Sequence, residues 1–295
     1  MDLIISDVTK EFDGFKAVDH FSFSLSCGVY GLLGVNGAGK TTLMRMLVTL
    51  MKPTTGRITW DGEDIFAMEG RYRSLLGYLP QDFGYYPDFS VYDYLMYIAA
   101  LKGIRPAVAK QRVKKLLRQV GLTEARHKKM KTLSGGMKRR AGIAQAMLNN
   151  PKILILDEPT AGLDPSERIR FRNLISELSE DRIVLLSTHI VSDIAYIADD
   201  ILLMKDGQLA ISGTAEALIA SMPETVWRCV VPKRNLNACL KAYKVANVKT
   251  VPGGAELRIV SRGKPSQDAV PVEATLEDVF LCYFGERAGD SDGSL

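Results

Sequence analysis

The stretch that decides the fold of this chain is Gly34-Val35-Asn36-Gly37-Ala38-Gly39-Lys40-Thr41-Thr42. It matches the phosphate-binding pattern G-x-x-x-x-G-K-[ST], in which backbone N–H groups converge on phosphate oxygens. The apolar run Val29–Leu33 before it predicts a strand. The pattern from Thr41 to Leu50 predicts a helix whose positive end points at the same place. These flanking elements favour a phosphate site over an ordinary strand–turn–helix corner, with Lys40 on the β- and γ-phosphates and the Thr41 hydroxyl on Mg²⁺.

A second strand-like run ends in two carboxylates. Lys152–Leu156 is apolar and is followed at once by Asp157 and Glu158. Ligands of open α/β sheets bind at the carboxyl ends of the strands, so both acids are expected beside the phosphate site. Asp157 would hold Mg²⁺ through its water shell, and Glu158 would orient and deprotonate the attacking water. Alone, such a strand could end in a solvated acidic loop, but the phosphate-binding loop favours the catalytic interpretation.

His189 follows a third apolar run, Ile183–Leu186, directly after Ser187 and Thr188. A histidine at this place could contact a γ-phosphate, although a lone histidine is more often a hydrogen-bonded structural residue. The pattern over Arg168–Leu178 predicts a helix between the second and third runs. Strand–helix–strand units of this kind build parallel sheets.

A second candidate anion site is Leu133-Ser134-Gly135-Gly136-Met137, which opens a predicted helix. A serine and two glycines at a helix N-terminus present backbone donors to an anion. A single nucleotide needs only one phosphate cradle, however. Two chains that each lend this second device to the other's nucleotide would account for both.

The composition is that of a globular protein with a hydrophobic core. The chain has 295 residues, of which 46% are hydrophobic and 24% are charged, and this balance excludes disordered, collagen-like and disulfide-framework chains. Its apolar runs are strand-length, far below the roughly 18–20 residues of a spanning helix, so an integral membrane protein is not expected. The segment from Met1 to Asp7 predicts no signal peptide. The four scattered cysteines suggest neither a zinc site nor a redox motif, which favours a reduced, cytosolic environment.

From Met1 to about Thr214, these motifs give the chain a resemblance to the ATP-binding cassette (ABC) family. Gly34–Thr42 resembles its Walker A motif, Ile153–Asp157 its Walker B motif and Leu133–Met137 its signature motif, which separates this family from other P-loop proteins. The remaining motifs also occur in family order: Gln81 is similar to the Q-loop glutamine, Glu158 to the catalytic glutamate, Ala161–Asp164 to the D-loop and His189 to the switch histidine.

The resemblance implies a fold and a full set of site residues. The fold is an α/β P-loop cassette with a mixed sheet core, an antiparallel β subdomain and a helical lobe over about residues 82–150. The implied catalytic residues are Lys40, Glu158 and His189, and the implied Mg²⁺ residues are Thr41, Gln81 and Asp157. The implied ATP-binding residues include Phe12, which would stack on adenine, and the whole set is Phe12, Gly34, Val35, Asn36, Gly37, Ala38, Gly39, Lys40, Thr41, Thr42, Gln81, Ser134, Gly135, Gly136 and Asp164.

The resemblance also implies partners. Ser134, Gly135 and Gly136 would bind the γ-phosphate held by a second ATPase subunit, in a homodimer or a paired cassette. Two residues depart from the family pattern. Met137 replaces the usual signature glutamine, and Ala161 replaces a common D-loop serine, which puts the polar contact across the dimer in doubt at that place. Every residue that faces phosphate or metal is present, so neither change predicts an inactive protein.

The chain divides into a cassette over residues 1–222, a small α+β appendage over 223–285 and a disordered tail over 286–295. In the appendage, Val226–Val231 and Glu256–Val260 predict strands, and Leu236–Tyr243 predicts a helix. Thr275-Leu276-Glu277-Asp278 predicts a capping box at the start of a last helix. Leu276–Phe280 resembles the tails of bacterial ATPase subunits that serve export-type permeases.

Two further segments are unusual. The first is basic, because Lys102 to Arg140 contains 14 Lys and Arg against one acid, Glu124. Within it, Lys110, Lys114, Lys115 and Arg118 point away from an apolar stripe. They form either a solvated face or a surface that docks on the permease and an anionic membrane. The second segment is rich in aromatic residues, which form either the core of the helical lobe or the groove for the permease's coupling helix: Tyr78, Phe83, Tyr85, Tyr86, Phe89, Tyr92, Tyr94 and Tyr97.

The sequence thus predicts an ATP-hydrolysing subunit, peripheral to the cytoplasmic face of the membrane, that powers transport, with export favoured, through a separate multi-spanning permease. A soluble cassette protein that acts on ribosomes or DNA is the alternative. Such proteins usually carry two cassettes or long insertions, and this chain has neither. No nucleic-acid recognition module accompanies the basic segment, so nucleic acid is not expected as a partner. A degenerate module that binds ATP without hydrolysing it is disfavoured by Glu158 and His189.

Overall fold

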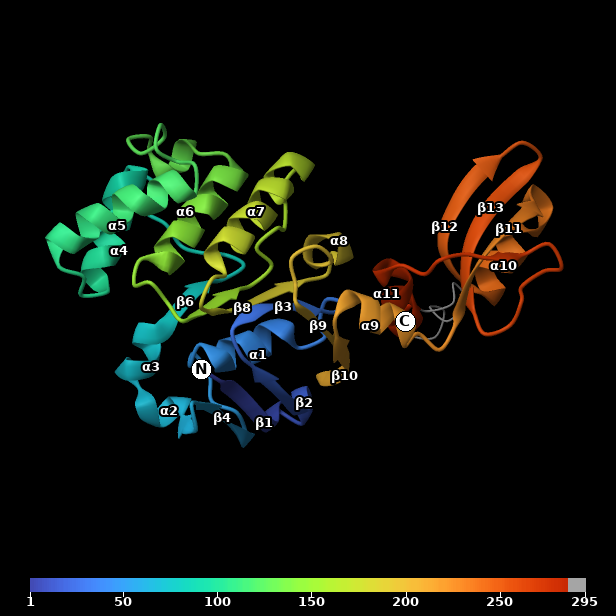
Figure 1. Cartoon of the computed structure of the whole chain (residues 1–295), viewed down its shortest axis with the longest axis horizontal. Helices are drawn as coiled ribbons and strands as arrows, with labels where there is room; N and C mark the ends of the chain where they lie inside the picture. The colour runs from blue at the N-terminus through green and yellow to red at the C-terminus, as the bar shows by residue number, and fades with distance from the viewer. Residues whose placement is uncertain (286–295) are drawn as a thin grey trace. The chain divides into compact units, whose positions relative to one another are not determined.

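This computed structural model describes residues 1–285, which form an N-terminal unit up to Ile211 and a C-terminal unit from Ser212 (Figure 1). The expected disordered tail, residues 286–295, lies outside the described residues. The functional division into a cassette over 1–222 and an appendage over 223–285 stays a prediction. None of the described helices is long and apolar enough to cross a membrane.

The N-terminal unit contains a small antiparallel sheet of strand order β2-β1-β4-β5. Its strands are β1 (Leu3–Phe12), β2 (Phe15–Leu25), β4 (Thr55–Trp60) and β5 (Glu63–Asp64). Two short helices follow, α2 (Ile65–Met68) and α3 (Gly70–Leu75). In β2, Phe21 and Leu25 are buried and Phe23 between them is half-buried, so these alternating residues lie on one side of the strand.

The second sheet of this unit has six strands in the order β10-β9-β3-β8-β7-β6. They are β3 (Gly28–Leu33), β6 (Leu76–Leu79), β7 (Ile153–Leu156), β8 (Ile183–Thr188), β9 (Asp200–Lys205) and β10 (Gln208–Gly213). The pairings β9–β3, β3–β8, β8–β7 and β7–β6 are all parallel. Every residue of β7 and β8 is buried, because helices or the other sheet cover both faces.

Helix α1 (Lys40–Leu47) joins the two sheets into one core. A single hydrophobic cluster includes Leu3 of β1, Leu43 of α1, Ile155 of β7 and Leu202 of β9. Figure 1 shows α1 between the antiparallel sheet and the parallel sheet. The phosphate-binding loop therefore leads into a helix that is fixed on two sides.

The helical lobe consists of α4 (Val91–Leu101), α5 (Pro106–Gln119), a 3-10 turn (Met130–Thr132) and α6 (Gly135–Met147). The apolar stripe of α5 is buried as predicted, at Val113, Leu116, Leu117 and Val120. Helix α7 (Pro165–Leu178) connects β7 to β8, and α8 (Val191–Ile194) follows β8. The predicted α/β fold with an antiparallel β subdomain and a helical lobe is confirmed.

The C-terminal unit has a four-stranded sheet of order β12-β13-β11-β14. Its strands are β11 (Thr225–Pro232), β12 (Lys244–Val251), β13 (Gly254–Ser261) and β14 (Val270–Pro271). The helical segments are α9 (Ala215–Ala220), a 3-10 turn (Lys233–Asn235), α10 (Leu236–Ala242) and α11 (Leu276–Phe284). The predicted capping box of Thr275 and Asp278 is present at the start of α11.

Candidate functional site

The topology brings four predicted motifs to one edge of the parallel sheet. The phosphate-binding loop follows β3, Asp157 and Glu158 follow β7, and His189 follows β8, which lies between those two strands. Gln81 follows β6, the neighbour of β7. Because all four strands are parallel, their carboxyl ends meet at the same edge, which is where such sheets bind ligands.

The phosphate-binding loop curls around the ammonium group of Lys40. Lys40 Nζ donates to the carbonyl oxygens of Gly34 and Val35, at 2.7 and 3.1 Å. Gly39 has a φ of 100°, and a Cβ at this position would overlap the carbonyl oxygen of Ala17, so only glycine fits. The loop thus holds a buried lysine at the N-terminus of α1.

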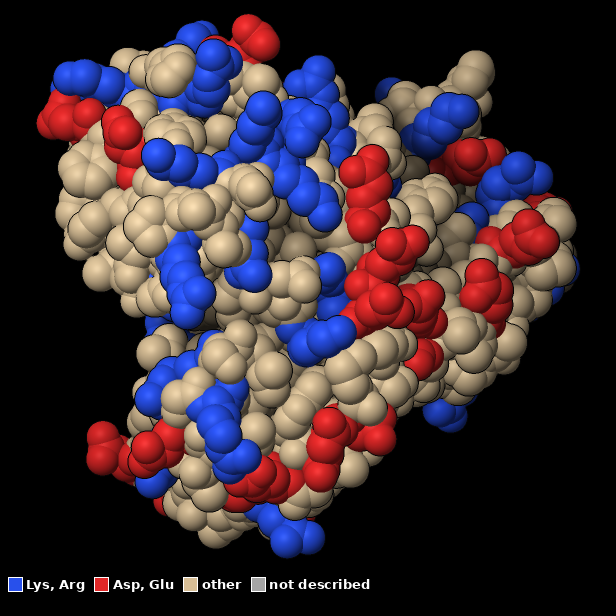
Figure 2. All heavy atoms as spheres, turned by 60° about the vertical axis from the view of Figure 1, so that its left-hand side comes forward, with Lys and Arg blue, Asp and Glu red and all other residues tan. Residues whose placement is uncertain are grey.

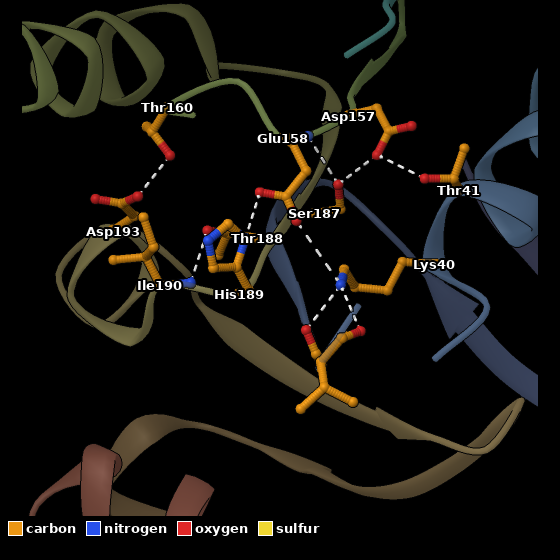
Figure 3. A network of polar contacts seen from close by, with 12 residues as sticks. Lys40, Thr41, Asp157, Glu158, Thr160, Ser187, Thr188, His189, Ile190 and Asp193 are labelled. Carbon is orange, nitrogen blue, oxygen red and sulfur yellow. Dashed lines mark hydrogen bonds and ion pairs between the residues drawn. The ribbon is translucent and has the colours of Figure 1, made fainter. Parts of the chain in front are cut away.

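A chain of polar contacts links this loop to the two carboxylates and to His189 (Figure 3). Thr41 Oγ1 donates to Asp157 Oδ1 at 3.3 Å, and Ser187 Oγ donates to the same oxygen at 2.7 Å. The Glu158 N–H donates to Ser187 Oγ at 2.9 Å. His189 Nδ1 lies 3.0 Å from Glu158 Oε2. The acids and the histidine therefore form one connected site with the loop.

Glu158, at the centre of this network, combines a left-handed backbone conformation with a buried carboxylate. Its backbone has a φ of 45°, a left-handed conformation that is uncommon for residues other than glycine and that clusters at functional sites. Its carboxylate is buried and lies 3.7 Å from Lys40 Nζ. Burial lowers the pKa of Lys40, while the charges of Glu158 and Asp157 oppose this effect. A negatively charged ligand would therefore relieve a partly desolvated cation.

A cleft of about 450 Å³ opens over these residues, within the usual size of ligand pockets. Its lining contains Asn36 to Thr42, Gln81, Glu158 and His189. The predicted adenine-stacking residue Phe12 is not among the lining residues. Phe15, which pairs with Phe12 across a tight hairpin, lines the cleft instead and is 66% exposed. The aromatic residue at each end of Asp13-Gly14 is the signal from which Phe15 could have been found.

The signature residues lie outside the nucleotide cleft of their own chain. Ser134 caps α6, where its Oγ accepts from the Met137 N–H at 3.2 Å. Gly135 lines a separate cleft of about 320 Å³, together with Gln81 and Gly162. Gln81 is thus the one predicted site residue that lines both clefts.

Asp164 is likewise apart from the nucleotide cleft, because it caps α7. Its Oδ1 accepts from the Glu167 N–H at 2.9 Å and from Ser166 Oγ at 2.8 Å. Both hydrogen bonds hold the pKa of the Asp164 carboxyl below its ordinary value, and the one from the Glu167 N–H has the larger effect. Within one chain, Asp164 therefore stabilises a helix N-terminus.

Arg139 is the functional candidate that sequence reasoning missed. It lies two residues beyond Met137 on α6 and is only 8% exposed. Its guanidinium donates to four backbone carbonyls, those of Gln81 (2.6 Å), Pro80 (3.3 Å), Pro159 (2.9 Å) and Glu158. Arg139 therefore ties the signature helix to the backbone of Gln81 and Glu158. In the sequence it was one of 14 basic residues, and nothing marked it as buried.

A phosphate-binding loop that joins strand-terminal carboxylates at the edge of a parallel sheet defines a P-loop nucleoside triphosphatase. The family model described as ABC transporter matches residues 18–161. The chain is also 37% identical over 301 residues to Nod factor export ATP-binding protein I of Burkholderia lata, and this match covers 96% of the chain and 97% of that protein. The chain belongs to the ABC transporter family, as an ATP-binding, ATP-hydrolysing subunit.

Solved structures agree with this assignment. CbiO1 from Clostridium perfringens, part of the ABC transporter complex cbiONQ, superposes with a TM-score of 0.69 at 28% identity, over 74% of this chain and 90% of that one. A bacterial ABC transporter cassette, solved as a dimer, gives a TM-score of 0.66 at 23% identity, over 72% of this chain and 98% of that one. At 23% identity, the similarity to this second structure shows the fold alone.

Proposed function

We propose that this subunit hydrolyses Mg²⁺-bound ATP with Lys40, Glu158 and His189, and that it powers export through a separate membrane permease. The observation that carries the proposal is the connected network from Lys40 through Glu158 to His189 at the mouth of the phosphate-binding loop. The exposed Phe15 ring at the same cleft offers a stacking surface for adenine. The lysine would exchange its two loop carbonyls for the β- and γ-phosphates.

The donor set fits a magnesium ion that arrives with the nucleotide. Thr41 Oγ1 and Asp157 Oδ1 are hard oxygen ligands 3.3 Å apart, and Gln81 adds an amide oxygen to the same cleft. Among residues 1–285, no group of three or more His, Cys, Asp or Glu side chains could hold a metal by itself. This agrees with an ion held mainly by phosphates and water. When bound, the ion neutralises charge that develops on the phosphate oxygens.

Glu158 is the proposed general base. Its carboxylate would accept a proton from the attacking water as that water's oxygen bonds to the γ-phosphorus and the bond to the β-phosphate oxygen breaks. His189 would orient the carboxylate, because it lies 3.0 Å from Oε2 while Lys40 faces Oε1 (Figure 3). Ser187 fixes the backbone of Glu158 and the side chain of Asp157 at once. The base is therefore positioned before substrate binds.

A second cassette completes the site in this proposal. Ser134 and Gly135 are exposed at the N-terminus of α6, outside the nucleotide cleft of their own chain, so they are available to a γ-phosphate held by a partner, whereas Gly136 is buried beside Glu167. Support also comes from the dimer that a cassette of this fold forms. The partner could be a second copy of this chain or a paired cassette.

The export direction is supported by the similarity to the Nod factor export subunit along nearly its whole length. A surface on the helical lobe would receive the permease. Tyr86 and Tyr97 are 47% and 36% exposed, and both rings pack against Phe89, with centroids at 5.1 and 5.7 Å. Of the aromatic segment, Tyr94 is buried and the members other than Tyr86 and Tyr97 are half-buried, so these two are the rings that a partner at the cytoplasmic membrane face could contact.

The proposed chemistry is tested by measuring phosphate release and binding of a fluorescent ATP analogue in parallel. Glu158→Gln should bind the analogue normally and hydrolyse ATP at least about a hundred-fold more slowly, because a general base contributes roughly 10²–10⁴ in rate. Lys40→Ala should lose affinity as well as turnover. Glu177→Gln, an exposed acid of α7, is the matched control and should behave like the wild type. Normal hydrolysis by Glu158→Gln would refute its assignment as the base.

A further inference from the structure

A pocket on the helical lobe is lined by basic side chains around the apolar Leu117. It has a volume of about 490 Å³ and shares no lining residue with the nucleotide cleft. Helix α4, helix α5 and the segment that follows α5 form its walls. The residues that matter are Tyr92, Lys110, Lys114, Leu117, Arg126 and His127, and none of the described lining residues is acidic.

Backbone hydrogen bonds hold the walls of this pocket in place. The Tyr92 N–H donates to the carbonyl oxygen of Arg126 at 2.9 Å, and the Val91 N–H donates to that of Lys128 at 3.1 Å. These bonds fix the segment after α5 to the first turn of α4. At the other wall, the Leu122 N–H donates to the Leu117 carbonyl at 2.8 Å and ends α5 tightly. The pocket is therefore formed before any ligand arrives.

The cations of this pocket have no partner for their charge. The side chains of Lys110 and Lys114 are exposed and, within residues 1–285, make no hydrogen bond or ion pair, and the same holds for the imidazole of His127. Arg126 uses Nη1 on the Thr123 carbonyl, which leaves the rest of its guanidinium free. By contrast, the nearby Lys129 and Lys131 are both paired with Asp88. Clustered like charges of this kind favour an anionic ligand.

The basic residues of α5 are not equivalent. Figure 2 shows that Lys and Arg side chains gather on the upper part of the molecule, with few acids among them. Among the basic residues of α5, Lys110 and Lys114 line a pocket without an acidic residue in the described part of the chain, whereas Arg112 and Lys115 line one that contains Glu177 and Glu180.

We propose that this pocket binds the phosphate of an anionic phospholipid headgroup. The three cations Lys110, Lys114 and Arg126 would surround the phosphate together with the imidazole of His127, while Leu117 and the ring of Tyr92 would contact the apolar part of the lipid. A tyrosine ring suits this position, because it has an apolar body and a polar tip and is favoured at membrane interfaces. The inference rests on the membrane position in the proposed function, and its test does not depend on ATP hydrolysis.

The test is flotation of the full chain with phosphatidylcholine vesicles, with and without phosphatidylglycerol. The double variant Lys110→Gln/Lys114→Gln should lose about thirty-fold in binding to the phosphatidylglycerol vesicles, because each basic residue at an anionic surface contributes a factor of about five. The matched control Lys115→Gln/Arg118→Gln removes the same charge from the same helix but leaves the pocket intact. It should lose less than about three-fold, because neither residue lines the pocket and Lys115 lies beside Glu177 and Glu180. Equal losses in the two variants would overturn the pocket in favour of a diffuse basic face.

Further measurements distinguish a lipid headgroup from free phosphate and from an acidic segment of the permease as the ligand. Inorganic phosphate or glycerol phosphate at millimolar concentration should not displace the wild type from vesicles, and full displacement would identify a site for free phosphate instead. Equal vesicle binding by the wild type and the pocket variant would also overturn the proposal. If that variant then lost co-purification with the permease, an acidic segment of the permease would be the ligand. ATP hydrolysis should be unchanged in both double variants, so failure here is distinct from failure of the proposed chemistry.

Discussion

At the scale of single residues, Arg139 determines how the two halves of the site are coupled. It is the buried contact between the signature helix and the backbone that carries Glu158, and it also holds the carbonyl of Gln81. Burial lowers the pKa of its guanidinium, while Asp82, Asp157 and Glu158 oppose this effect. Arg139 touches none of the residues of the phosphate-binding loop in the described hydrogen bonds, so we class it as a positioning residue.

Arg139→Gln should therefore lower kcat more than it raises KM for ATP. Loss of the guanidinium leaves buried carbonyls without donors, which costs about 1–3 kcal/mol of stability. It also frees Glu158 to move, and a shift of 1 Å can cost about a hundred-fold in rate. We expect kcat to fall ten- to a hundred-fold with KM changed less than about three-fold, as measured by steady-state phosphate release.

Arg140→Gln is the matched control for that prediction. Arg140 lies next along α6 and is paired with Glu167 and with the carbonyls of Val120 and Gly121, so it has no link to Glu158. Its loss should cost stability without lowering kcat selectively. If both variants lowered kcat equally, Arg139 would have only a structural role.

The sequence predicted which motifs converge at the sheet edge, because these motifs combine residue type with place on a strand. The phosphate-binding loop, Asp157, Glu158 and His189 all follow apolar runs, so their convergence follows from a parallel sheet. Phe15 and Arg139 were not predicted, because no local sequence pattern singles them out. Which of two hairpin aromatics faces a cleft, and which of several arginines is buried, depends on packing that a local pattern does not record.

At the scale of elements, some strands have a clear local sequence pattern, and others are specified by pairing with their neighbours. Strands β7 and β8 are buried on both faces and read as continuous apolar runs. Strand β1 shows no simple alternation of apolar and polar residues, because Asp7, at a φ of 50°, and the register shift between Ile5 and Val8 interrupt it. Strand β12 lies at a sheet edge with most residues exposed, so pairing with β13 specifies it, and no apolar pattern does.

An ion pair between the buried Asp278 and the half-buried Arg258 lies at the start of helix α11 in the C-terminal unit. Arg258 donates to both carboxylate oxygens of Asp278, from Nε to Oδ1 at 3.0 Å and from Nη2 to Oδ2 at 2.6 Å. Burial alone would raise the pKa of Asp278, but hydrogen bonds from Arg258 and from Thr275 outweigh it and hold the pKa below its ordinary value of 3.8. The pair should therefore stabilise the unit above pH 3.8, and this contribution should be lost as the pH falls through the lower, folded-state pKa.

Asp278→Asn should remove roughly 2–4 kcal/mol from the free energy of unfolding of this unit at neutral pH, because it leaves Arg258 without its partner. It should also remove the loss of stability below about pH 4 that the wild type shows. Each unit contains one tryptophan, Trp60 and Trp227, so Trp60→Phe makes fluorescence report on the C-terminal unit alone. Glu277→Gln, exposed on the same helix, should leave the pH profile as in the wild type. A pH profile of Asp278→Asn that matches the wild type would contradict the role of the pair.

At the scale of the whole molecule, the phosphate-binding loop and the signature residues Ser134–Gly136 lie apart within one chain. The signature residues line no part of the nucleotide cleft in their own chain. Two chains arranged head to tail would let each signature meet the nucleotide of the other. We therefore expect Glu158→Gln, which binds ATP without turning it over quickly, to accumulate as a dimer with saturating ATP and no Mg²⁺. Size exclusion with light scattering measures this directly.

Gly135→Asp in the Glu158→Gln background is the variant that makes the dimer prediction specific. The space where a Cβ would lie at Gly135 is open, so this substitution should not disturb the monomer. It places a carboxylate where the partner's γ-phosphate would bind, and like charges at about 4 Å repel by roughly 1–4 kcal/mol. The double variant should bind ATP normally and stay monomeric. Dimers that persist despite Gly135→Asp would show that the signature does not meet the partner's nucleotide.

If Glu158→Gln alone stays monomeric while saturated with ATP, the same measurement is made with the permease present. It decides whether the head-to-tail dimer requires the membrane partner or does not form at all.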